Sequence, residues 1–176
     1  DNPRCIHQTN DGGYIVIGFS LSSNTGTLTG FTNNGSYDYW ILKLDSSGNI
    51  VWQKLIGGSM EDSGAWIQEI NGGYIVAGYS ISSNTGTLTG LTNNGSYDYW
   101  ILKLDENGNI IWQNTYGGSD DDFCRSIYQT LDGGFLLTGG VNSIDGDITS
   151  VHGGINGDLW VVKIDSTGNI QWQHSY

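Results

Sequence analysis

The chain has few positive charges: 6 lysine and arginine residues stand against 18 aspartate and glutamate residues, giving a formal net charge of -12. Such a field repels phosphate backbones, so we expect no nucleic-acid partner. Charged residues of either sign make up only 14% of the sequence. Neutral polar groups must therefore cover much of the surface, a composition typical of extracellular β-proteins, and we expect an extracellular or cell-surface location.

Long apolar runs and helical patterns are also missing. No run approaches the length of a membrane span, and no signal peptide is recognisable. No stretch of about ten positions shows helical spacing of its apolar residues, and the 28 glycines interrupt each candidate. The absences predict an all-β protein with no membrane span.

The two cysteines do not follow any regular pattern. The chain contains a threefold repeat, in which Cys5 aligns with Ala65 and Ser126, and Cys124 falls at a different repeat position. A disulfide framework would repeat with that pattern. We therefore expect two small buried thiols.

What the chain does contain is one pattern written three times, about 60 residues apart. A glycine pair followed by an apolar run occurs at 12–16, 72–76 and 133–137. A Trp-centred run ending in aspartate occurs at 39–45, 99–105 and 159–165. Repeats this regular indicate a single supersecondary unit, copied, whose apolar face is buried against the next copy.

Each unit predicts four short antiparallel strands. In the second unit, β-branched and aromatic runs separated by turn residues place them at 63–70, 74–80, 98–104 and 109–116. Four such strands per unit are the pattern of a β-propeller blade, and we expect three blades at 1–56, 57–116 and 117–176. The main alternative is a β-solenoid, whose coils are usually shorter and lack large aromatic residues at fixed places.

The third and fourth strands of each unit are joined by an Asp-x-x-Gly-x-x-x-Trp motif, at 45–52, 105–112 and 165–172. The motif resembles the tryptophan-docking repeat of quinoprotein-like β-propellers. The whole unit is similar to the secreted β-propeller repeats of large bacterial surface proteins. The resemblance implies that the Trp wedges between adjacent blades. Because this fold hosts many functions, it implies no cofactor and no catalytic residue here.

The number of units raises the question of closure. Closed propellers have about four to eight blades, and three would leave two sheet faces exposed. Either the repeats continue in a longer array, or two chains pair into a six-bladed ring. We favour the longer array.

Binding residues are expected in the long loops at 20–37, 80–97 and 141–157, which should share a face with the links between blades. Amide and aromatic groups recur there and suit sugar hydroxyls and ring faces; the candidates are Asn33, Asn34, Tyr37, Asn93, Asn94 and Tyr97. The alternative interpretation is structural: Asn makes turns, and Tyr covers the loop.

Acidic residues at 120–122, with Asp145 and Asp147, offer the hard oxygen ligands that Ca²⁺ prefers. Their spacing is not that of an EF-hand, and in the second unit only Glu61 and Asp62 match them, with Met60 in place of an acid. We expect a solvated acidic loop and no cofactor, with Ca²⁺ binding there as the alternative.

Catalysis has little support, because His7, His152 and His174 do not recur and no nucleophile or phosphate-loop motif is present. The sequence therefore predicts a non-catalytic binding or scaffolding module for a protein or glycan ligand. One alternative is an enzyme with its site in a central channel, for which Arg4 and Arg125 are the charged candidates. The other is a purely structural repeat.

Overall fold

The computed structural model describes residues 1–150 and 157–176. Within them the chain forms three four-stranded antiparallel sheets, each with its strands in sequence order. The first sheet contains β1 (Asn2–Gln8), β2 (Tyr14–Ser20), β3 (Asp38–Leu44) and β4 (Ile50–Ile56). The second contains β5 (Asp62–Ile70), β6 (Gly73–Ser80), β7 (Asp98–Leu104) and β8 (Ile110–Tyr116). The third contains β9 (Asp122–Gln129), β10 (Phe135–Val141), β11 (Asp158–Ile164) and β12 (Ile170–Ser175).

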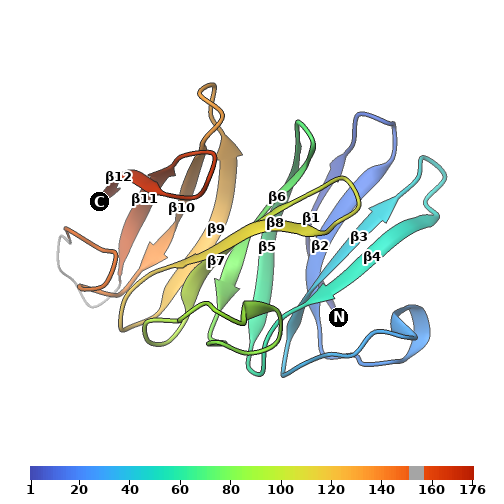
Figure 1. The fold of residues 1–176 in the computed structure, drawn as a ribbon, viewed down its shortest axis with the longest axis horizontal. Helices are drawn as coiled ribbons and strands as arrows, with labels where there is room; N and C mark the ends of the chain where they lie inside the picture. Colours follow the sequence, from blue (N-terminus) through green and yellow to red (C-terminus); the bar gives the residue numbers. More distant parts are fainter. Residues whose placement is uncertain (151–156) are drawn as a thin grey trace.

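The sheets lie side by side in chain order, the first at the right of Figure 1 and the third at the left. The tight turns within each sheet lie along one edge of the molecule, at the top of the view, and the long loops lie along the opposite edge. We call these the turn edge and the loop edge.

The all-β class and the four-stranded antiparallel sheets are confirmed. The strand ends expected for the second unit differ from those of β5 to β8 by no more than one residue. The sequence did not predict the short 3₁₀ turns η1 (Gly26–Leu28) and η2 (Gly86–Leu88) inside the long loops. The described residues contain no α-helix, and none of their helices is long and apolar enough to cross a membrane.

Two aromatic pairs, one at each boundary, determine how adjacent sheets pack. The ring of Tyr39 lies 4.6 Å from that of Trp100 in the next sheet, and Tyr99 lies 4.9 Å from Trp160. All four side chains are fully buried. Gly78 makes this approach possible, because a Cβ there would collide with the Tyr39 hydroxyl.

The register corrects one alignment made from the sequence. Cys5 pairs with Ile17 across β1 and β2, and Trp66 pairs with Ala77 across β5 and β6. Trp66, rather than Ala65, therefore occupies the position of Cys5. The reason is that the segment 70–73 has one residue fewer than the equivalent segment 9–13.

Both cysteines are free, as expected. Cys124 is fully buried, whereas Cys5 is only half-buried. Burial raises the pKa of the Cys124 thiol to about 12 and also raises that of Cys5.

Candidate functional site

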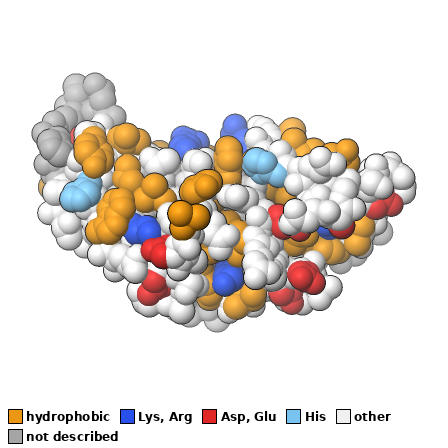
Figure 2. All heavy atoms as spheres, turned by 90° about the horizontal axis from the view of Figure 1, so that it is seen from above, with side chains coloured by type: hydrophobic (Ala, Val, Ile, Leu, Met, Phe, Trp, Pro, Cys, Tyr) orange, Lys and Arg blue, Asp and Glu red, His pale blue; other side chains and the backbone are white. Residues whose placement is uncertain are grey.

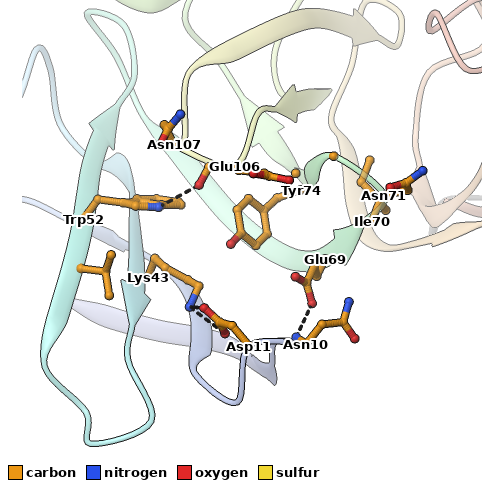
Figure 3. Close-up of a pocket in the computed structure, with 13 residues that line it drawn as sticks. Asn10, Asp11, Lys43, Trp52, Glu69, Ile70, Asn71, Tyr74, Glu106 and Asn107 are labelled. Carbon is orange, nitrogen blue, oxygen red and sulfur yellow. Dashed lines mark hydrogen bonds and ion pairs between the residues drawn. The ribbon is translucent and has the colours of Figure 1, made fainter.

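A cavity of about 510 Å³ opens between the first and second sheets at the turn edge. Its aromatic walls are Trp52 and Tyr74, which lie across its middle in Figure 3. Carboxyl, amide and amino groups surround them, from Asn10, Asp11, Lys43, Glu69, Asn71, Glu106 and Asn107.

A hydrogen bond and a ring contact hold Trp52 at the boundary between the first and second sheets. Its Nε1 donates a 3.1 Å hydrogen bond to the carbonyl of Glu106, in the turn between β7 and β8. The ring packs edge-on against Tyr74 at a centroid distance of 5.7 Å. Trp52 of the first sheet therefore contacts the second sheet, and this contact forms one wall of the cavity.

Tyr74 places a hydroxyl group at the cavity. Its side chain is only 4% exposed, and no hydrogen bond to the hydroxyl is formed within the described residues. Burial, followed by the charges of Glu69, Asp11 and Glu106, raises its pKa to about 12. The hydroxyl therefore keeps its proton at neutral pH and is available as a donor to a ligand.

One cation lies at the base of the cavity. The Lys43 Nζ lies 2.8 Å from a carboxylate oxygen of Asp11 and donates to the Leu44 carbonyl at 3.0 Å. The hydrogen bond from Lys43 is the largest cause that holds the pKa of Asp11 well below its usual range. In the third sheet Lys163 pairs likewise with Asp132 at 3.0 Å.

Three further side chains line the cavity without holding the fold together. Asn71, Glu106 and Asn107 are exposed, and no hydrogen bond or ion pair of their side chains is formed among the residues that the structure describes. Together with the Tyr74 hydroxyl they place acceptors and donors around the cavity. This arrangement suits a neutral or weakly cationic ligand with several hydroxyl groups.

The six binding residues expected from the sequence lie at the loop edge, away from this cavity (Figure 1). The amide of Asn33 donates to the carbonyls of Ser20 and Ser36 at 2.8 and 3.0 Å, and its oxygen accepts from the Gly35 N–H at 2.9 Å. Asn93 repeats the contacts to Ser80 and Gly95.

Asn34 and Asn94 tie their loops to the following link. The backbone N–H of Asn34 donates to Asp38 at 2.9 Å, and its amide donates to the Gly57 carbonyl at 3.3 Å. Asn94 makes the equivalent contacts to Asp98 and to the Gly117 carbonyl. These amides hold the loops in shape, and their role in binding stays a prediction.

Tyr37 and Tyr97 belong to two separate aromatic clusters at the loop edge. Tyr37 packs edge-on against Phe19 at 4.9 Å. Tyr97 packs against Tyr79 at 5.5 Å and Phe123 at 5.2 Å. Both tyrosines are half-exposed.

Both arginines also lie on these clusters. The Arg125 guanidinium lies 5.4 Å from the ring centre of Tyr79 and 5.3 Å from that of Phe123. Arg4 lies 5.0 Å from the ring centre of Phe19. Each arginine is the extra residue of a β-bulge in the first strand of its sheet.

Three of the five acidic residues considered for Ca²⁺ make local structural contacts. The buried Asp122 accepts from the Gly118 N–H at 2.8 Å and from the Ser143 hydroxyl at 2.8 Å. Asp145 and Asp147 accept from backbone N–H groups of the link at 117–119. In the part of the chain that the structure describes, no three His, Cys, Asp or Glu residues are grouped to hold a metal ion. His152 lies outside the described residues.

The sequence analysis missed this cavity. Tyr74, Glu69 and Glu106 look like ordinary strand and turn residues, and the cavity arises only when two sheets meet. A signal was available in the shorter turn at 70–73, which differs from the turns at 9–13 and 130–134.

No protein-family model matches the chain, and a search of curated proteins finds no match.

Proposed function

We propose that the chain is a non-catalytic, extracellular binding module that recognises a glycan in the cavity between its first and second sheets. The observation that carries the proposal is the Tyr74 hydroxyl, which has no partner among the described residues and belongs to a ring packed on Trp52 in a cavity rimmed by carboxylates and amides.

A sugar matches this chemistry group by group. Its hydroxyls can donate to the carboxylates of Glu69 and Glu106 and accept from the Asn107 amide and the Tyr74 hydroxyl. Its apolar ring face can pack against the exposed part of Trp52. A phosphorylated or strongly acidic ligand fits less well, because the net charge of the protein is -12 and Lys43 is already paired.

A second candidate is protein binding at the loop edge. The exposed Arg125 guanidinium stacked on Phe123 and Tyr79, next to Tyr97, resembles the aromatic and arginine content of protein interfaces. The segments 22–45 and 82–105, which include most of the first two long loops, are nearly identical in sequence. Two such loops would let weak contacts add through multivalency.

The glycan proposal is tested by retention of the purified chain on a panel of immobilised neutral and amino sugars. Glu106→Gln and Asn107→Ala are expected to reduce retention without lowering the unfolding midpoint, because their side chains are exposed and make no fold contacts in the described structure. Ser47→Ala is the matched control, since Ser47 holds the same turn position in the first sheet, outside the cavity lining.

The glycan site would be refuted if the chain retained no sugar on the panel. It would also be refuted if Glu106→Gln and Asn107→Ala retained the sugar as well as the native chain. Retention lost instead on Tyr97→Ala or Arg125→Ala would favour the loop edge.

A further inference from the structure

The outer face of the first sheet has the composition of a buried interface but is open. In the second sheet, Trp100 and Leu102 are fully buried against the first sheet. The residues 60 positions earlier, Trp40 and Leu42, face the opposite way from the second sheet and are only partly buried. The outer face of the first sheet thus carries the same Trp and Leu pair as the buried face of the second sheet, but no sheet packs against it in the described structure.

The outer face of the third sheet shows the complementary situation. Leu159 is 51% exposed and Trp172 is 44% exposed. Their counterparts at the inner boundaries, Tyr99 and Trp112, are packed against the next sheet. Figure 2 shows hydrophobic side chains exposed at the end of the molecule where the third sheet lies.

A specific hydrogen bond marks each inner boundary. Trp52 Nε1 donates to the Glu106 carbonyl, and Trp112 Nε1 donates to the Ser166 carbonyl, both at 3.1 Å. Each acceptor directly follows the turn aspartate of the next sheet. Trp172 is the third donor and has no acceptor within the described residues.

The matching third acceptor is the carbonyl of Ser46, which follows Asp45 in the first sheet. The chain therefore carries both halves of one further contact, the donor on its third sheet and the acceptor on its first.

An apolar socket accompanies this acceptor. At the inner boundary Tyr39 fits over Gly78 and against Trp100. In the first sheet the equivalent Gly18 and Trp40 line an open pocket of about 190 Å³.

The third sheet offers Leu159 at the position of Tyr39. The tyrosine hydroxyl is not required at every boundary: the Tyr39 hydroxyl donates to the Trp100 carbonyl at 3.3 Å, whereas the Tyr99 hydroxyl is buried without a partner in the described structure. A leucine at this position satisfies the apolar socket and leaves no polar group unpaired.

We propose that two copies of the chain dock through these faces, the third sheet of each against the first sheet of the other. Leu159 enters the socket beside Trp40, and Trp172 Nε1 donates to the Ser46 carbonyl of the second copy. A two-fold axis repeats the contact, so that six sheets close a ring, within the range of about four to eight found in propellers.

The experiment is light scattering after size exclusion over a range of concentrations. We expect a mass near twice 19.1 kDa. Leu159→Asp is expected to give the monomer, because it places an unpaired charge in the socket while changing a side chain that is 51% exposed in the single chain. Met60→Asp is the matched control: Met60 is 50% exposed in the link between β4 and β5, away from both outer faces, and this variant should keep the native mass.

Hydrogen exchange gives an independent measurement of the contact. The backbone around 45–48 and 170–175 should be more protected at high concentration than at low concentration. A monomer at the highest soluble concentration would overturn the proposal and point to further repeats of a longer chain as the partners of these faces. An open polymer, or a dimer that Leu159→Asp leaves intact, would also overturn it.

Discussion

The indole Nε1 of Trp112 donates a 3.1 Å hydrogen bond to the carbonyl of Ser166, across the boundary between the second and third sheets. It repeats the contact of Trp52 with Glu106 one sheet earlier. The repeated sequence therefore encodes the joint between units as well as the units themselves.

Trp112→Phe keeps most of the apolar area at this joint and removes the donor. We expect it to lower the free energy of unfolding by about 1 kcal/mol. Trp172→Phe is the matched control, since Trp172 Nε1 has no acceptor in the described chain. Urea denaturation at a concentration where the chain is monomeric measures both, and equal losses would show that the hydrogen bond is not what stabilises the joint.

Two adjacent glycines in β10 should respond differently to the same substitution. A Cβ on Gly139 would collide with the Phe123 carbonyl and the Tyr99 hydroxyl, whereas a Cβ on Gly140 meets nothing within 4 Å. Gly139→Ala should therefore lower the free energy of unfolding by about 1 to 3 kcal/mol. Gly140→Ala should be neutral or stabilise by up to about 1 kcal/mol. A similar loss in both variants would contradict the packing described at this boundary.

Stability should fall as the pH rises from about 4 to about 7. Burial is the main cause that raises the pKa of Asp38 and Asp62 to about 6 and that of Asp98 to about 7. A carboxyl group with a raised pKa in the folded chain binds more protons there than in the unfolded chain. Its contribution is complete below the unfolded pKa and is lost as the pH rises through the folded value.

Urea midpoints at pH 5 and pH 8 test this directly, with the higher midpoint expected at pH 5. Asp98→Asn should weaken the dependence, because Asn does not titrate. The exposed turn aspartates act in the opposite sense: hydrogen bonds lower the pKa of Asp105 and of Asp132, the latter to about 2, so their contribution is lost only in stronger acid. A midpoint that rises from pH 5 to pH 8 would argue against the buried carboxyls as the dominant groups.

The two thiols should differ in reactivity. Cys5 is half-buried and Cys124 is fully buried, with its thiol pKa raised to about 12 by burial. Since the thiolate is the reactive form, we expect an alkylating reagent at neutral pH to modify Cys5 slowly and Cys124 only after unfolding. Mass spectrometry of the native chain should show a single modified site, and rapid labelling of Cys124 would mean that the third sheet opens readily.

The strands could be predicted from the sequence because each unit repeats the same local signals. β7 begins at Asp98 and ends at Leu104, as expected, since an aspartate before a Trp-rich run and an Asp-x-x-Gly turn after it define both ends. The aspartate holds this turn in shape: Asp105 accepts from the N–H groups of Asn107 and Asn109 at 2.9 and 2.8 Å.

The candidate site could not be predicted in the same way. Tyr74 and Phe135 occupy the same repeat position. The sequence shows that Tyr74 carries a hydroxyl group, but only the neighbouring sheet determines that a polar cavity lies beside it. Glu69 lies near the end of β5 and Glu106 lies in the turn between β7 and β8, and the sequence does not place these two elements together. The shorter turn at 70–73 shifts β5 by one residue relative to β1 in the repeat. Aligning the units at a constant spacing of 60 residues does not show this shift.

The measurement that tests the proposed function most directly is the binding isotherm of a retained glycan with the native chain and with Tyr74→Phe. The third sheet already carries Phe135 at this position, so the fold should tolerate the change. Loss of one ligand hydrogen bond of about 1 kcal/mol predicts an affinity about five- to tenfold weaker for Tyr74→Phe, with an unchanged unfolding midpoint. Equal affinities would show that the ligand does not use this cavity.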